Sequence, residues 1–291
     1  MGGRHAYMIM AHHKFSILKE LLKDLDDERN DLFLHVDKKA RDFDPEDICA
    51  SIKKARICIT ERMDVRWGGF SQIKCILMLL ERATGAGNHA YYHFMVGVEF
   101  PLKTQDYIHR FFDEHQGYEF IGFDHEDQKY MDRVRYYHIF NEYARNNTFF
   151  QKILNKINFG CVYIQKMLHV DLTKRYGIAF KKGNANWSLT HDLARYILSK
   201  KEEVSRIYRH SFCGDEVFIH TIVFNSVFYK KVYDVEDEYR SSMRVMTWED
   251  EKNQYHLKDL NYLMGCKRLF ARKIDGGDAL RLIDGIKRSR E

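Results

Sequence analysis

Residues 6–37, AYMIMAHHKFSILKELLKDLDDERNDLFLHVD, decide the fold of this 291-residue chain. Residues 6–11 form an apolar run of strand length, and residues 31–36 form a second one. Between them, phenylalanine and leucine recur over residues 15–25 at the spacing of an amphipathic helix. The stretch therefore predicts a strand, a helix and a second strand.

The same alternation continues with a helix over residues 45–55 and a strand over 55–60. A β-α-β-α-β order is typical of a parallel sheet with crossover helices, and such sheets bind ligands at the carboxyl ends of their strands. His12 follows the first strand and Asp37 the second, so we expect both on one rim. Two interpretations stay open, a nucleoside site or a structural histidine beside a turn-capping aspartate.

Two neighbouring carboxylates, Asp215 and Glu216, lie within residues 211–224, SFCGDEVFIHTIVF. The apolar run after them predicts a mostly buried helix, so the carboxylates would lie in its first turn. One interpretation makes Asp215 a helix N-cap with Glu216 as its companion. The other makes Glu216 a base that takes a proton from a substrate hydroxyl.

Other segments add candidate binding residues. The Gly-Gly turn in residues 65–71, VRWGGFS, precedes a predicted helix, where a ligand can approach the backbone N–H groups. Further strands are predicted over 91–98, with Glu99 at its end, and over 119–123. Trp187 precedes a helix capped by Ser188 or Thr190, and either packs in the core or forms a platform for a sugar ring.

Residues 128–177 combine Lys and Arg with Tyr and Phe, and no acidic residue lies between Glu142 and Asp171. This pattern fits a helical layer with a solvated basic side. It also fits a surface for anionic lipid or a lipid-linked acceptor. A site for single-stranded nucleic acid is the third interpretation.

The composition excludes several classes of protein. A hydrophobic content of 45% with 31% charged residues indicates a soluble globular chain, and a net charge of +5 is too small to indicate nucleic-acid binding by itself. The six cysteines are far apart and are expected to be reduced, without a zinc site. Dinucleotide-binding GxGxxG, Walker and GxSxG motifs are absent. Asp24 and Asp26 form a DxD inside a predicted helix, where the two side chains point to different faces.

The order of motifs resembles glycosyltransferase family 14, the core 2 and I branching β-1,6-N-acetylglucosaminyltransferases and the related xylosyltransferases. The matching segments are HHKF, HVDKKA, VRWGGFS, GVEFPLKTQDYI, NWSLT, GDEVFIHTI, RVMTW and LFARKID, which run in this order through nearly the whole chain. The resemblance implies an α/β, GT-A-like fold in which a Rossmann-type nucleotide-binding half with a mostly parallel sheet merges with an α+β catalytic and acceptor half. We expect one continuous domain with parts 1–125, 126–177 and 178–291.

The resemblance also implies an inverting transfer from a UDP-sugar to an acceptor hydroxyl, with no metal or other cofactor. It assigns the catalytic base to Glu216. The nucleotide and its diphosphate would be bound by six residues, which are His12, Asp37, Trp67, Ser71, Arg244 and Lys273. The donor and acceptor sugars would contact Glu99, Trp187 and Asp215.

The donor sugar implied by the family is N-acetylglucosamine, with other hexoses or xylose left open. The acceptor would be a glycan or a lipid-linked saccharide, and no nucleic acid is expected. The first residues lack the pattern of a signal peptide, so the predicted location is cytoplasmic, with peripheral contact to an anionic membrane. A sugar- or nucleotide-binding module without catalysis is the main alternative, and a membrane- or nucleic-acid-binding protein is another.

Overall fold

The structure is a computed structural model that describes residues 3–143, 148–247 and 253–290. Its centre is a five-stranded sheet in the order β3-β2-β1-β4-β6. The strands are β1 (His5–Ala11), β2 (Asn30–Val36), β3 (Arg56–Ile59), β4 (Tyr91–Val96) and β6 (Trp187–Thr190). The first four are parallel and β6 is antiparallel at the edge. The predicted mostly parallel α/β fold is therefore confirmed.

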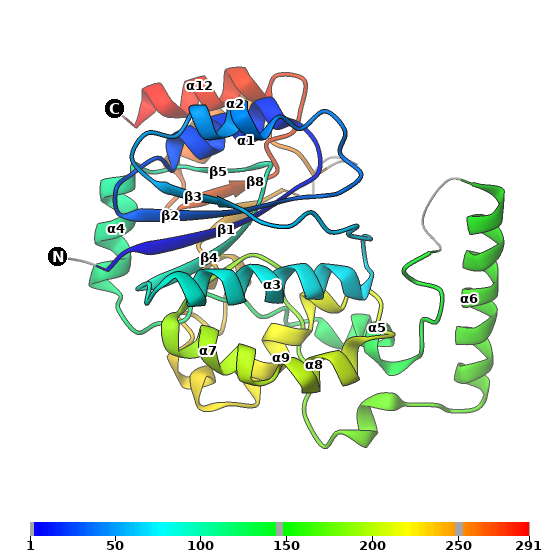
Figure 1. Cartoon of the computed structure of the whole chain (residues 1–291). Helices are drawn as coiled ribbons and strands as arrows, with labels where there is room; N and C mark the ends of the chain where they lie inside the picture. Colours follow the sequence, from blue (N-terminus) through cyan, green and yellow to red (C-terminus); the bar gives the residue numbers. More distant parts are fainter. Residues whose placement is uncertain (1–2, 144–147, 248–252, 291) are drawn as a thin grey trace.

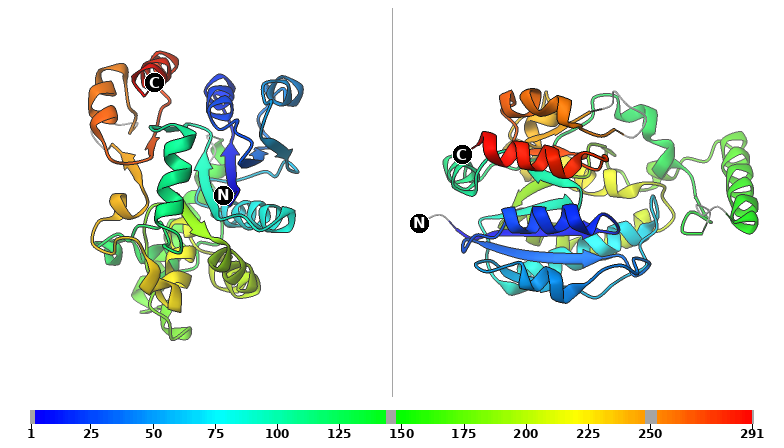
Figure 2. Two further views of the ribbon diagram at one scale, coloured as in Figure 1. Left: turned by 90° about the vertical axis from the view of Figure 1, so that its left-hand side faces the viewer. Right: turned by 90° about the horizontal axis from the view of Figure 1, so that it is seen from above.

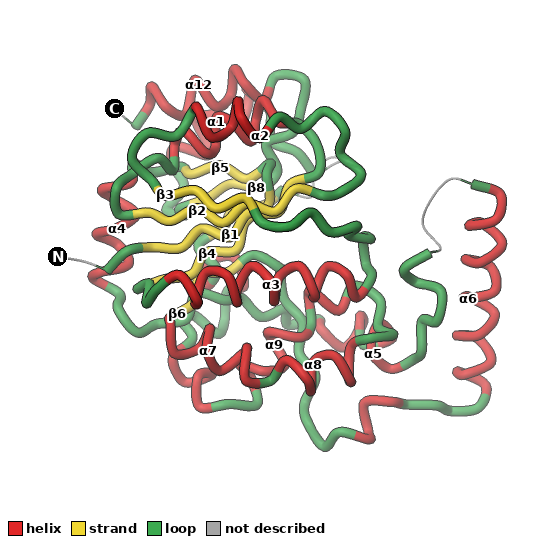
Figure 3. The backbone as a smooth tube through the Cα atoms, viewed as in Figure 1, coloured by secondary structure: helices red, strands yellow, loops and turns green. Residues whose placement is uncertain are grey.

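Helices cover both faces of this sheet (Figure 1, Figure 3). On one face, α1 (Phe15–Asp24), α2 (Pro45–Ala50) and α12 (Ala279–Ser289) enclose one apolar cluster. On the other face, α3 (Phe70–Ala86) and α7 (His191–Ser199) enclose a second. Because β1 and β2 are buried on both sides, the middle of each strand is a run of apolar residues rather than an alternating pattern, and the polar residues of β2 are buried as well.

A second, three-stranded sheet lies beside the first. It has the order β5-β8-β7, formed by β5 (Glu99–Pro101), β8 (Phe270–Arg272) and β7 (Arg244–Met246). This sheet brings residues from the end of the chain next to the carboxyl end of β4. The predicted strand over residues 244–248 is confirmed for its first three residues, and Trp248 lies outside the described residues.

The prediction of a strand over residues 119–123 is wrong. Only two isolated bridges form there, Glu119 with Val232 and Phe120 with Ser188. The remaining helices are α4 (Gln105–Glu114), η1 (Asp127–Tyr130), α5 (Asp132–Arg135), α6 (Phe149–Met167), η2 (Leu172–Arg175), α8 (Lys201–Tyr208), η3 (Gly214–Glu216), α9 (Phe218–Phe224), η4 (Val227–Lys231), α10 (Glu238–Ser241), η5 (Leu257–Asp259) and α11 (Leu260–Gly265).

Helix α6 stands apart from the layered body in two perpendicular views (Figure 1, Figure 2). In Figure 1, α6 lies on the side of the molecule at which β1 ends. Within the part of the chain that the structure describes, no helix is long and apolar enough to cross a membrane.

Candidate active site

A cleft of ≈ 740 Å³ opens at the carboxyl ends of the central strands. Met10 and His12 at the end of β1, Asp37 after β2 and Val96 at the end of β4 line it. The chain runs outward from β1 to β2 and β3, and then returns to the other side of β1 as β4. The cleft therefore lies at the point where the strand order reverses, which is the usual ligand site of open α/β sheets.

His12 and Asp37 lie on the same rim, as the sequence predicts. The His12 ring packs against His13 with 4.2 Å between ring centroids, and burial followed by the charge of His13 lowers the pKa of His12. The Asp37 carboxylate accepts hydrogen bonds from Lys39 N at 2.8 Å and Val65 N at 3.2 Å, and pairs with Lys39 Nζ. Asp37 thus fixes two loops of the cleft, and a contact with a nucleoside stays a prediction.

The Gly-Gly turn lies beside the cleft, but its helix terminus already holds a carboxylate. Gly68 has a φ of +72°, and a Cβ on Gly69 would meet the Glu142 carboxylate at 2.6–2.8 Å. Glu142 accepts hydrogen bonds from Ser71 N at 2.7 Å and Ser71 Oγ at 2.8 Å. Trp67 lines the cleft and is 52% exposed, whereas Ser71 is not among the lining residues. The close approach for which Gly69 leaves room is therefore made by Glu142 of the same chain.

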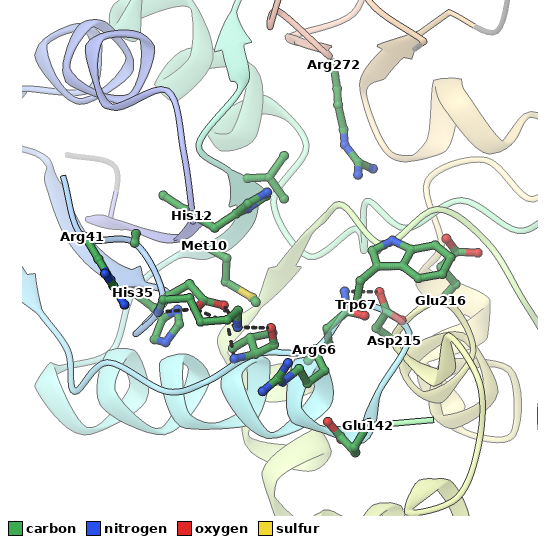
Figure 4. A pocket seen from close by; sticks show the side chains of 18 of the residues that line it. Met10, His12, His35, Arg41, Arg66, Trp67, Glu142, Asp215, Glu216 and Arg272 are labelled. Atoms are coloured by element: carbon green, nitrogen blue, oxygen red, sulfur yellow. Dashed lines mark hydrogen bonds and ion pairs between the residues drawn. The ribbon is translucent and has the colours of Figure 1, made fainter. Parts of the chain in front are cut away.

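Asp215 and Glu216 reach the cleft wall from a short turn. Residues 214–216 form the 3₁₀ turn η3, and helix α9 begins two residues later, at Phe218. Neither element has a side-chain cap hydrogen bond, so the interpretation of Asp215 as a helix N-cap is wrong. Asp215 and Glu216 both line the cleft (Figure 4).

Glu216 is oriented by two cations. Arg133 Nη1 forms an ion pair with Glu216 Oε2, and Lys182 Nζ lies 3.7 Å from the same oxygen. Lys182 is itself held by Asp124 at 3.0 Å. The Glu216 side chain nevertheless remains 33% exposed, so a substrate hydroxyl can reach it. Arg133 belongs to the basic segment, but its spacing of 83 residues from Glu216 gives no sequence signal for this pair.

Asp215 is in a different environment. It is buried, Gln72 Nε2 donates to its Oδ2 at 3.3 Å, and its Oδ1 has no hydrogen-bond partner among the residues described. Burial, and then the negative charge of Glu216, raise the pKa of Asp215 to about 7. Asp215 therefore stays protonated to a higher pH than an ordinary aspartate, which is how enzymes keep a carboxyl group neutral.

Replacing Asp215 by asparagine is expected to remove a pH dependence of stability. The unfolded chain ionises this group near pH 3.8 and the folded chain near pH 7, so the folded state holds the extra proton between these values. Wild-type stability therefore falls as pH rises through that window, by at most about 4 kcal/mol. Unfolding free energies in urea at about pH 5 and about pH 8 should fall less in Asp215→Asn than in wild type. Equal pH slopes would contradict the raised pKa.

Arg272 is the cation that enters the cleft from the second sheet. Its side chain points into the cleft in Figure 4, and Nη1 donates to Asn186 Oδ1 at 2.8 Å. Its buried Nε has no hydrogen-bond partner in the described part of the chain. Lys273 is the next residue and is not among the lining residues. The LFARKID segment thus contributes Arg272 to the cleft, a residue that is not among the predicted site residues, and a diphosphate contact of Lys273 stays a prediction.

Arg244 and Glu99 are not brought to the cleft. They form an ion pair with 3.2 Å between Arg244 Nε and Glu99 Oε1, and neither side chain has any exposed surface. Asn186 Nδ2 also donates to Glu99, at 2.6 Å. A side chain without exposed surface cannot contact a diphosphate or a sugar in this conformation. We therefore revise both predictions, because the pair holds the second sheet together.

Trp187 is likewise a residue of the core. It lies in β6, is 1% exposed, and stacks on Phe94 with 5.4 Å between ring centroids. The cap of α7 is Thr190, whose side chain accepts a hydrogen bond from Leu193 N. The aromatic residue that the cleft does present is Trp67, so a sugar platform at Trp187 is not supported.

The DxD of Asp24 and Asp26 lies away from the cleft. Asp24 pairs with Arg290, and Asp26 accepts hydrogen bonds from the backbone N–H groups of residues 53–55. Across the described ranges, no group of three or more His, Cys, Asp or Glu side chains is placed to hold a metal ion.

The chain matches the family model described as Core-2/I-Branching enzyme over residues 5–264. The chain belongs to this family. It is therefore a glycosyltransferase, an enzyme with a sugar-nucleotide donor and a glycan acceptor. Among solved structures, the crystal structure of mouse xyloside xylosyltransferase 1 in its apo form aligns with 93% of this chain and 97% of that chain, with 10% sequence identity and a TM-score of 0.42. No protein with a curated description matches.

Proposed function

We propose that this glycosyltransferase is inverting and metal-independent, with a UDP-sugar as its donor. The observation that carries the proposal is the placement of Glu216, a partly exposed carboxylate held by Arg133 at the wall of the strand-end cleft. Arg272 supplies a cation to the same cleft. A base and a cation in one cleft meet the two requirements of transfer, deprotonation of the acceptor and charge neutralisation at the leaving diphosphate.

In the proposed reaction, the acceptor oxygen attacks the anomeric carbon of the donor from the face opposite the diphosphate. The bond from the anomeric carbon to the diphosphate oxygen breaks, its electron pair leaves with UDP, and the proton of the acceptor passes to Glu216. One displacement inverts the configuration, which yields a β-linkage from an α-linked donor. Water activation by a carboxylate in inverting glycosidases follows the same logic.

The donor would lie across the rim formed by the ends of β1 and β2. His12, Asp37 and Trp67 line this side and offer an imidazole, a carboxylate and an exposed ring to the nucleoside. The guanidinium of Arg272 would bond the diphosphate, because a guanidinium binds phosphate oxygens well. Lys273 stays a predicted second cation because it follows Arg272 directly. N-acetylglucosamine remains the proposed donor sugar, and another hexose or xylose would use the same chemistry.

The proposal is tested by UDP release from a panel of UDP-sugars, with simple sugars as acceptors and with or without EDTA. We expect turnover with at least one donor, unchanged by EDTA, and a β-configured product by NMR. Turnover that EDTA abolishes would contradict the role of Arg272. Absence of turnover, together with no change in melting temperature on adding any UDP-sugar, would contradict the proposed donor class.

A further inference from the structure

Helix α6 presents its apolar side to the outside of the molecule. Its large hydrophobic side chains are mostly exposed, and Phe149 has an exposed fraction of 80%. The exposed apolar residues of α6 and its C-cap are Phe149, Phe150, Ile153, Ile157, Phe159, Tyr163, Ile164, Met167 and Leu168. A contiguous apolar surface of this kind marks an interaction site.

The side of α6 that faces the rest of the chain mixes polar residues with the half-buried Leu154, Cys161 and Val162. Asn158 is the only buried residue of the helix. One helical repeat further on, Gln165 exchanges hydrogen bonds with the backbone of Tyr137 at 2.8 and 3.0 Å, and Lys166 pairs with Asp132 at 2.6 Å. A surface helix of a globular domain normally has the opposite arrangement, with its apolar side toward the core. The exposed apolar residues of α6 are therefore not used by the fold.

The charges of α6 identify the partner. The helix has three lysines and no acidic residue. On a helical projection of 100° per residue, the residues 149, 153, 157, 164 and 167 form one stripe, and Lys152 and Lys156 border it. An apolar stripe bordered by lysines suits a helix that lies in the interface of an anionic bilayer. A second copy of the chain fits less well, because the lysines of two facing helices would repel each other.

We propose that α6 docks the enzyme on an anionic membrane surface. The apolar stripe enters the boundary between headgroups and acyl chains, and Lys152 and Lys156 pair with lipid phosphates. Docking would place the cleft near that surface, because the cleft lies at the carboxyl end of β1 and α6 lies on the same side of the molecule (Figure 1). This placement suits an acceptor that is itself held in the membrane.

Co-sedimentation with vesicles tests the proposal. We expect wild type to bind vesicles of phosphatidylcholine with roughly one-third phosphatidylglycerol, and to bind pure phosphatidylcholine at least about tenfold more weakly. Raising the salt concentration should weaken binding to the mixed vesicles, because the lysine contacts are screened. An Ile153→Asp/Ile157→Asp variant should lose binding to both kinds of vesicle. Lys152→Gln/Lys156→Gln should lose the preference for the anionic lipid.

Val227→Asp is the matched control, because Val227 is 75% exposed on η4 and should bind like wild type. All substituted side chains are exposed, so unchanged melting temperatures would confirm that every variant folds. Equal binding by wild type and the Ile153→Asp/Ile157→Asp variant, or no binding by wild type, would overturn the proposal. A dimer in sedimentation velocity that this variant converts to a monomer, without vesicle binding by wild type, would instead assign the surface to a second copy. These readouts require no sugar transfer, so they are independent of the proposed reaction.

Discussion

Replacing Glu216 by glutamine is expected to lower kcat by about 10²- to 10⁴-fold, because the acceptor hydroxyl then has no base to receive its proton. Glutamine keeps nearly the size of the side chain and can still accept a hydrogen bond from Arg133. The KM for the UDP-sugar should change little, since the donor would lie on the side of His12 and Asp37. Steady-state kinetics with a soluble acceptor at saturating donor would measure both constants.

The control for this prediction is Asp42→Asn, which removes the charge of another carboxylate that lines the same cleft. It should retain most of the wild-type kcat. The dependence of kcat on pH distinguishes a base from a charge that only contributes to the cleft. A base must be ionised to act, so the wild-type rate should fall at low pH, and the glutamine variant should no longer show this fall. If Glu216→Gln and Asp42→Asn lowered the rate equally, the carboxylates would act through cleft charge and not as a base.

The rim of the cleft could be predicted from the sequence because it depends on local order. Strand-length apolar runs at residues 6–11 and 31–36 fix where the strands end, and the parallel order brings His12 and Asp37 together. The place of Glu216 at the start of a buried helical segment could be predicted for a related reason, because its small-residue turn and the apolar run after it are adjacent in the sequence. These are short-range patterns, and the observed elements differ from them mainly at their ends.

The other contacts of the site depend on long-range packing. Arg133 and Glu216 are 83 residues apart, and nothing in either segment identifies the partner. The prediction of a sugar platform at Trp187 is not supported for a similar reason. Only an exposed ring can bind a sugar, and the exposure of Trp187 depends on the layers that pack around β6, which the local sequence does not show. In LFARKID, the sequence places two cations side by side, and only the position of β8 beside the cleft distinguishes Arg272.

Arg244→Met is expected to destabilise the protein by about 3–5 kcal/mol, because it leaves the carboxylate of Glu99 buried without its cation. Arg244 also donates hydrogen bonds to Ser188 Oγ at 2.9 Å and to the Ser242 carbonyl at 2.6 Å, and its guanidinium lies 4.5 Å from the centroid of the Phe270 ring. Burial raises the pKa of Glu99 and Arg244 lowers it, so the variant should unfold more readily as pH rises and Glu99 ionises. Urea unfolding at several pH values would measure both effects.

The matched variant is Arg272→Met, which makes the same change on the neighbouring strand of the second sheet. Arg272 lines the cleft, so its loss should cost less stability and should raise the donor KM by about 10- to 100-fold, as expected for a charged hydrogen bond to phosphate. Adding Glu99→Gln to Arg244→Met should restore part of the lost stability, since the buried charge is then removed. A stable Arg244→Met variant with a raised donor KM would mean that Arg244 reaches the diphosphate. The ion pair with Glu99 would then have to open when the donor binds, and the assignment to Arg272 would be wrong.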